Sequence, residues 1–134
     1  MRVGLLWHSA SSGNLGVGAL TIANIALVRE AALKLGVEPR FTIVGMRDGE
    51  VPAYLGPADC DVFVVDRRSL LSPKGCWAVL GRQDCVLDIG AGDSFAEIYG
   101  AKRFFFLWLT KAITLARGRP LLMSPQTIGP FTRA

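Results

Sequence analysis

The sequence lacks the long hydrophobic runs that mark membrane-spanning and secreted proteins. Its longest apolar segment, residues 104–116, is interrupted by Lys111 and two threonines and is well short of the ~20 residues that cross a bilayer. The apolar start of the chain turns polar at His8 and Ser9, which is too early for a signal peptide. We therefore expect no transmembrane segment and a cytoplasmic protein, with a position at the inner face of the membrane as a further expectation.

The sequence is also poor in cysteine and has no concentration of charge. Its three cysteines, Cys60, Cys76 and Cys85, match neither a disulfide framework nor a Cys-x-x-Cys metal site, and they predict buried thiols. The 15 Lys and Arg residues are scattered among 11 Asp and Glu residues, so we expect no nucleic-acid partner. No second histidine, cysteine or aspartate stands at ligand spacing from His8, so we also expect no metal. A hydrophobic content of 51% with a net charge of +4 excludes intrinsic disorder.

What is present is the pattern of an α/β domain. Five short apolar runs, residues 3–7, 41–44, 62–65, 86–89 and 121–123, do not alternate polar with apolar, which predicts strands buried on both faces. Helices are predicted over residues 18–35, ending at Gly36, and over residues 102–117, ending at Gly118. The first of these has Leu20, Ile25, Ala32 and Leu35 on its expected apolar face.

The remaining connections give weaker signals. Residues 45–61 predict a loop, and residues 73–82 predict a short helix with Ser72 as its N-cap and Pro73 in its first turn. We therefore expect a doubly wound, Rossmann-like parallel sheet of about five strands in the order 3-2-1-4-5. Winding reverses between strands one and four, and ligands bind beyond the carboxyl ends of the strands at such a switch point.

The second long helix begins with an apolar run at residues 104–109. A helix that is apolar all round is usually covered on more than one side. Two interpretations stay open: a second lobe or another subunit packs on residues 104–109, or the domain's own sheet and helices bury them. If another copy of the same chain covered residues 104–109, the protein would be a homo-oligomer.

The loop after the first strand, residues 8–18, is rich in glycine and small hydroxyl residues and leads into a helix. Glycine lets a backbone approach a ligand closely, and a helix N-terminus offers N–H groups to an anion. The glycine spacing matches neither a Walker loop nor the Gly-x-Gly-x-x-Gly dinucleotide fingerprint. An anion-binding loop and a plain turn before a capped helix both fit. His8, the only histidine, lies where the first strand ends, a position that favours a site role more than a random one would. The alternative of a solvated loop residue stays open, because a lone loop histidine is usually solvated.

The loops after the fourth and fifth strands carry further polar groups. Asp93 follows a Gly-Ala-Gly segment, and its carboxylate is able either to bind a sugar hydroxyl and take its proton or to cap a helix. Ser94 and Glu97 have the spacing of a capping box, which explains both without a ligand. Gln126 and Thr127 offer neutral hydrogen bonds to hydroxyl groups.

Three motifs in these loops resemble the polysaccharide pyruvyl transferase family. They are Gly-Asn-Leu-Gly at residues 13–16, Asp-Ile-Gly-Ala-Gly-Asp-Ser-Phe at residues 88–95 with Tyr99, Gly100 and Arg103, and Ser-Pro-Gln-Thr-Ile-Gly-Pro-Phe at residues 124–131. They occur in the family's order, and the resemblance runs over nearly the whole chain, from residue 13 to residue 131.

The resemblance implies a two-lobed fold similar to that of GT-B glycosyltransferases, with residues 1–134 as the amino-terminal lobe and the carboxyl-terminal lobe absent from this chain. Members of the family move the pyruvyl group of phosphoenolpyruvate onto two hydroxyls of a saccharide, leaving a cyclic ketal and free phosphate. The implied partners are phosphoenolpyruvate and a saccharide or lipid-linked glycan of the exopolysaccharide or cell envelope. No metal or organic cofactor is implied.

Carried onto this sequence, the resemblance makes Asp93 the catalytic residue that binds or deprotonates a hydroxyl, and it makes Arg103 the cation for phosphate or carboxylate. The general acid is expected in the other lobe. The chain departs from the family pattern at Val17, commonly acidic, and at Ala91, commonly glycine. The alternatives are a lobe of a nucleotide-sugar glycosyltransferase and a non-catalytic sugar- or anion-binding module. The substrate-binding residues expected with Arg103 are His8, Asn14, Gly16, Gly92, Ser94 and Gln126.

Overall fold

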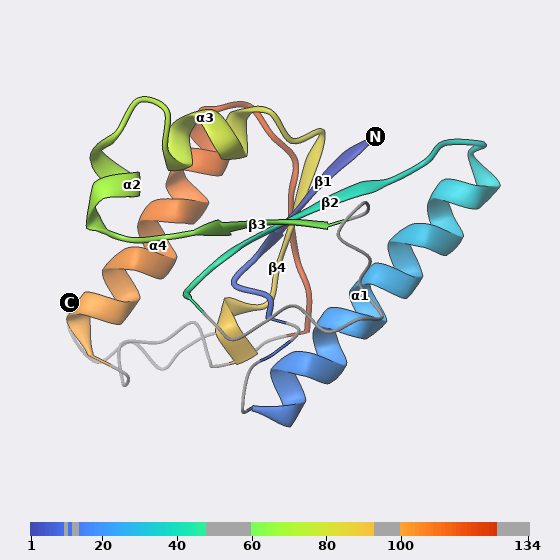
Figure 1. Ribbon diagram of the computed structural model, residues 1–134, viewed down its shortest axis with the longest axis horizontal. Helices are drawn as coiled ribbons and strands as arrows, with labels where there is room; N and C mark the ends of the chain where they lie inside the picture. Colours follow the sequence, from blue (N-terminus) through green and yellow to red (C-terminus); the bar gives the residue numbers. More distant parts are fainter. Residues whose placement is uncertain (10, 12–13, 48–59, 93–99, 126–134) are drawn as a thin grey trace.

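The computed structural model describes residues 1–9, 11, 14–47, 60–92 and 100–125 (Figure 1). The strands are β1 (Arg2–Leu6), β2 (Arg40–Gly45), β3 (Cys60–Val64), β4 (Cys85–Asp88) and β5 (Leu121–Met123). The helices are α1 (Leu15–Lys34), α2 (Arg67–Leu71), α3 (Cys76–Gly81) and α4 (Ala101–Ala116), with a single 3-10 turn, η1 (Gly90–Gly92), directly after β4.

The strands form one parallel sheet in the order β3-β2-β1-β4-β5, which confirms the predicted architecture. β1 is central and pairs with β2 on one side and β4 on the other, with Leu5 beside both Ile43 and Leu87. The chain therefore winds outward from β1 in both directions, and the β1/β4 boundary is the switch point of a Rossmann-like fold.

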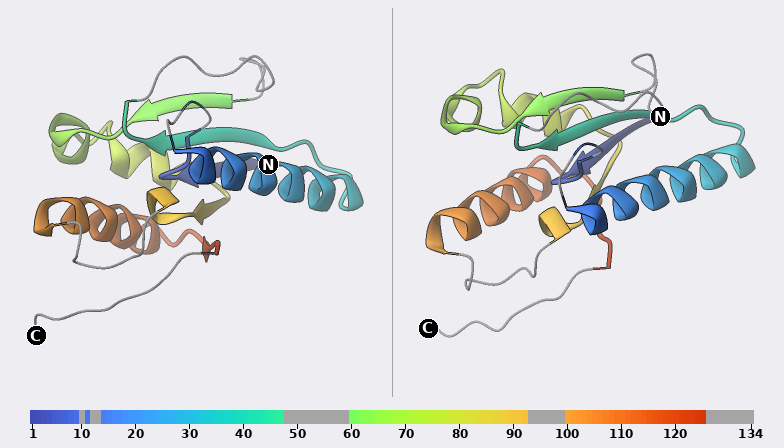
Figure 2. Two further views of the ribbon diagram at one scale, coloured as in Figure 1. Left: turned by 90° about the horizontal axis from the view of Figure 1, so that it is seen from below. Right: turned by 60° about the horizontal axis from the view of Figure 1, so that its bottom comes forward.

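Helices cover both faces of this sheet (Figure 2). On one face, Ile25 of α1 packs with Leu5, Phe41 and Leu87. On the other face, side chains of α3 and α4 pack against β1, β2 and β4 in a larger cluster around Leu80 and Leu107. The sheet separates the two cores. At the switch point the strand ends are therefore held from one face by α1 and from the other by α3 and α4.

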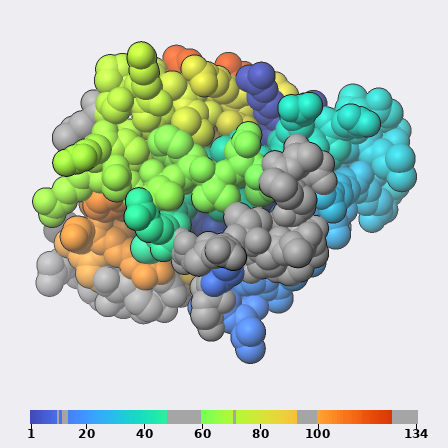
Figure 3. Space-filling model, in the orientation of Figure 1, coloured from blue at the N-terminus to red at the C-terminus, as the bar shows by residue number. Residues whose placement is uncertain are grey.

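The prediction that every strand is buried on both faces is wrong for the two edge strands. Residues of β1 from Val3 onward are fully buried, but Val62 of β3 is 49% exposed and Leu122 of β5 is 51% exposed. In Figure 3 the green atoms of β3 lie across the front of the molecule. An apolar run predicts a strand, but it does not show whether that strand lies at the edge of the sheet, where its side chains are less covered.

Helix α1 begins earlier than predicted and buries a more polar face. Asn14 caps it by accepting hydrogen bonds from the N–H groups of Gly16 and Val17. Ile25 and Ala32 are buried as expected, but Leu35 is exposed, and Thr21 and Asn24 occupy the buried face. α1 is also the one described helix that is long and apolar enough, by length and composition, to cross a membrane, although core helices of folded domains meet the same criterion.

The connection between β3 and β4 differs from the prediction. Ser72 ends α2 instead of starting the next helix, and α3 begins at Cys76 after Gly75. Asp66 caps α2 through a capping box with Ser69. A Cβ atom at position 75 would overlap the Ser69 carbonyl, so only glycine allows α2 and α3 to approach this closely.

Helix α4 matches the predicted helix to within one residue, and Gly118 follows it with a φ of 65°. Its apolar run divides between two environments. Leu107 is buried in the core, whereas Phe105 and Trp108 are 51% and 49% exposed and contact each other with tilted rings whose centroids lie 6.2 Å apart. Within the described part of the chain, the domain's own elements therefore cover only one side of this helix.

Candidate functional site

A pocket of about 290 Å³ lies at the carboxyl edge of the sheet, at the β1/β4 switch point. Its size is near the lower end for small-molecule sites. Three of the expected site residues, His8, Asn14 and Arg103, lie in its wall. They come from the end of β1, the start of α1 and the first turn of α4, so elements far apart in the sequence converge here. The other described residues that line it are Trp7, Ser9, Val17, Met46 and Ala91.

The backbone at this edge is strained at the ends of both switch-point strands. Among the described residues, the non-glycine residues with positive φ are Trp7 (59°), directly after β1, and Ala91 (62°), shortly after β4. A left-handed conformation costs a non-glycine residue roughly 1–2 kcal/mol. Such strain concentrates at functional sites, where the surrounding structure holds it in place. Both residues line the pocket.

His8 is buried and neutral, not solvated. Its Nδ1–H donates to the Leu6 carbonyl (3.0 Å), and its Nε2 accepts from Asn24 Nδ2 (2.9 Å). Ser124 Oγ in turn donates to Asn24 Oδ1 (3.0 Å), which links the ends of β1 and β5 through α1. Burial lowers the pKa of His8 to about 4, outweighing the opposite effect of the Leu6 hydrogen bond. Both ring nitrogens are used inside the protein, so the imidazole positions the strand ends instead of offering a nitrogen to a ligand.

Asn14 and the glycines shape the opposite wall. Asn14 Oδ1 is occupied by the cap of α1, and Gly16 contributes its backbone N–H to that cap. Gly92 has a φ of 74°, and a Cβ atom there would overlap Val17 Cγ2. The turn after β4 therefore packs directly on the first turn of α1 only because residue 92 is glycine. Gly16 and Gly92 act through the backbone.

A buried ion pair supports the turn after β4. Asp88 Oδ2 lies 2.7 Å from Lys111 Nζ, and the two side chains are 0% and 8% exposed. The other oxygen of Asp88, Oδ1, accepts a hydrogen bond from the Gly90 N–H (2.9 Å). Lys111 thus ties α4 to β4 just below the pocket. In the sequence Lys111 is recognisable only as a break in an apolar run, because it is 23 residues from Asp88 and nothing local indicates the pair.

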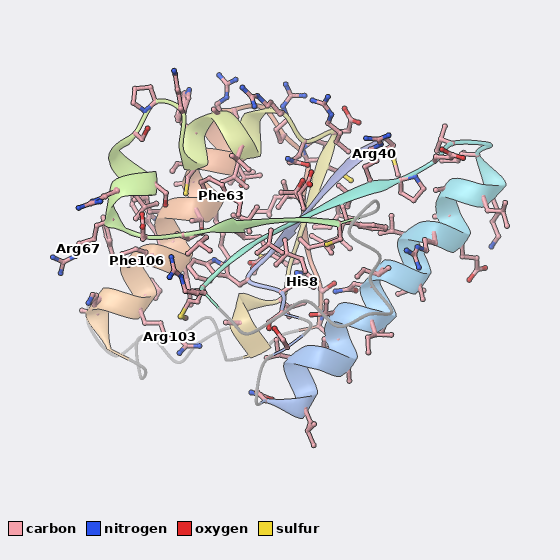
Figure 4. All side chains as sticks on the ribbon, in the orientation of Figure 1. His8, Arg40, Phe63, Arg67, Arg103 and Phe106 are labelled. Atoms are coloured by element: carbon pink, nitrogen blue, oxygen red, sulfur yellow. The ribbon has the colours of Figure 1, made fainter. Side chains whose placement is uncertain are left out.

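A second pocket, of about 440 Å³, adjoins the first and shares Trp7, Met46 and Arg103 with it. Arg103 thus stands at the junction of the two. In Figure 4, Arg103 extends from α4 toward the region below His8, whereas Arg40 lies at the opposite end of the molecule. A guanidinium here is able to make paired hydrogen bonds to a phosphate or carboxylate in either pocket.

The expected residues Asp93, Ser94 and Gln126 lie outside the described residues, as does Glu97 of the proposed capping box. The structure does place the segments that lead to them, since Gly92 and Ser124 both lie at the carboxyl edge. Within the described ranges, no three His, Cys, Asp or Glu side chains are grouped as a metal site requires.

Comparisons with known proteins leave the family open. No protein-family model matches this chain, and neither does any curated protein or solved structure. The geometry of the pocket and the motif resemblance therefore remain as the evidence on function.

Proposed function

We propose that this chain is the amino-terminal lobe of a GT-B-like transferase that moves the pyruvyl group of phosphoenolpyruvate onto saccharide hydroxyls. The observation that carries the proposal is the convergence of Arg103, Asn14 and the strained turn at Ala91 on one small pocket at the switch point. The described parts of the three resembling motifs, residues 14–16, 88–92 and 124–125, lie at this edge of the sheet, and Arg103 is the cation that the resemblance assigns to the donor.

The reaction sets clear demands on such a site. Two hydroxyl oxygens form bonds to C2 of phosphoenolpyruvate, the bond from C2 to the phosphate oxygen breaks, and the methylene gains a proton. Of the two hydroxyl protons, one balances the proton gained by the methylene and the other leaves with phosphate. Cations must hold the phosphate and carboxylate, and a base must accept the hydroxyl protons. In this lobe Arg103 supplies a cation and Asp93 the base, while the other lobe supplies the acid.

A nucleotide-sugar glycosyltransferase lobe is the second candidate. It is favoured by the contact between the two pockets, since together they offer more room than a three-carbon phosphate ester needs. The two candidates differ in the ligand that the switch-point pocket prefers.

A direct test is calorimetric titration of the chain with phosphoenolpyruvate and, separately, with a nucleoside diphosphate sugar. We expect binding of phosphoenolpyruvate and at least a tenfold loss of affinity, about 1.4 kcal/mol, in Arg103→Gln. Arg40→Gln is the matched control because it removes the same charge at the opposite end of the molecule. Preference for the nucleotide sugar would support the second candidate, and equal effects of the two substitutions would remove Arg103 from the site.

A further inference from the structure

The second pocket, hereafter the α2–α4 groove, differs in chemistry from the switch-point pocket. Its floor is apolar and comes from four elements or their ends: Trp7, Met46, Val65, Phe106 and Leu107. Val65 and Leu107 are buried in the larger core, and Phe106 packs against it, so the floor is held rigidly. An apolar surface of this kind favours a ligand that removes hydrocarbon from water.

The rim of the groove is positively charged. Among the described residues that line it, Arg67 at the start of α2, Lys102 at the start of α4 and Arg103 stand against one carboxylate, that of Asp66. Asp66 is committed to the cap of α2, where it accepts from the Ser69 N–H (2.7 Å), and this hydrogen bond lowers the pKa of its carboxyl. Asp66 therefore stays ionised but is turned to its own helix, and the rim keeps a positive balance.

Apolar floor and cationic rim together define the ligand. We infer that the α2–α4 groove binds an anionic amphiphile, a phosphate that carries an alkyl or prenyl chain, with the chain on Phe106 and Met46 and the phosphate against Arg67 and Lys102. An uncharged amphiphile would leave the cations unused, and a free phosphate would leave the apolar floor in contact with water. This inference goes beyond the proposed function and stands without it.

The test is a calorimetric comparison of three probes on the intact chain: octyl phosphate below its critical micelle concentration, inorganic phosphate, and octyl glucoside. We expect octyl phosphate to bind at least tenfold more tightly than either of the other two. Burial of roughly two methylene groups is enough for that factor. Trp7 belongs to the floor of the groove, and its indole N–H, which donates to Thr110 Oγ1, should show a shifted resonance on binding.

Two exposed-site variants separate the two halves of the ligand. Arg67→Gln with Lys102→Gln should weaken octyl phosphate at least tenfold, and Arg40→Gln should not. Met46→Ser should reduce the gain that the octyl chain brings, and Val37→Ser, which alters an apolar side chain of similar exposure, should not. Arg67, Lys102 and Val37 do not line the switch-point pocket, so retained phosphoenolpyruvate binding in those variants separates this inference from the proposed function.

Equal binding of octyl phosphate and inorganic phosphate would overturn the inference, because the floor would then contribute nothing. If octyl glucoside bound as tightly as octyl phosphate, the inference would be overturned as well, because the cationic rim would then not select an anion. If the parent chain bound octyl phosphate but not phosphoenolpyruvate, the proposed function would be overturned and this inference would stand.

Discussion

His8 is the residue in which burial and protonation are most closely linked. The folded chain binds a proton at His8 near pH 4, and an unfolded chain binds it near 6.5. The unfolded state therefore holds more protons between these values, and the free energy of unfolding should fall by about 3 kcal/mol as the pH is lowered from about 6.5 to about 4. Urea unfolding at pH 7, 6, 5 and 4 measures this loss.

The variant His8→Gln supplies the control, because it keeps a polar side chain at position 8 but does not titrate. It should be less stable than the parent at pH 7, since it loses the Leu6 and Asn24 hydrogen bonds in part. Its stability should depend less on pH over the same range. An unchanged pH dependence would mean that other groups cause the acid sensitivity.

Ala91 is the residue where strain is easiest to remove. Its φ of 62° is unfavourable for alanine and neutral for glycine, so Ala91→Gly should stabilise the fold by about 1 kcal/mol. Ala26→Gly makes the same chemical change at an exposed position within α1, where it should destabilise by about 1 kcal/mol. Opposite signs in thermal unfolding are the expected result, and a loss of stability in both variants would show that Ala91 is not strained.

At the scale of elements, the Asp88–Lys111 pair decides how α4 is fixed to β4. Lys111→Met removes one partner and leaves a buried carboxylate, which should cost about 3 kcal/mol. Combining it with Asp88→Asn should recover part of the loss, because the second change removes the stranded charge. A double-mutant cycle by urea unfolding measures the coupling, and purely additive losses would show that the two charges do not interact.

The elements themselves were largely predictable, but their environments were not. Apolar runs and terminal glycines predicted the five strands, α1 and α4, because these signals are local in the sequence. The strand order followed from the right-handed crossovers between parallel strands. The exposure of Val62 and the burial of Asn24 were missed because they depend on which element lies alongside. The site shows the same division. Position at a strand end predicted His8 and the motif resemblance predicted Arg103, and both line the switch-point pocket. The Asn24 partner of His8 and the Asp88–Lys111 pair were missed because they are contacts between distant parts of the sequence.

At the scale of the whole molecule, each of the two long helices exposes several apolar side chains to solvent. The two helix surfaces differ in whether charged residues lie among those side chains. On α4, Phe105, Trp108 and Leu115 follow the i, i+3, i+10 spacing of one helix face, with no charge between Phe105 and Leu115 on that face. On α1, Ile22 and Leu33 share an exposed face with Arg29 and Glu30. A charge within an apolar patch opposes its burial against another protein.

Self-association should therefore proceed through α4. Sedimentation equilibrium of the chain at tens of micromolar should give a concentration-dependent mass above the 14.4 kDa of one chain. The double variant Phe105→Ser with Trp108→Ser should return the mass to that value, because it removes the pair of aromatic rings that lie in contact on this face. The matched double variant Ile22→Ser with Leu33→Ser removes two exposed apolar side chains from α1 and should leave the association unchanged. If this second variant abolished association instead, the α1 face would be the contact, and the charges of Arg29 and Glu30 would have to be paired across it.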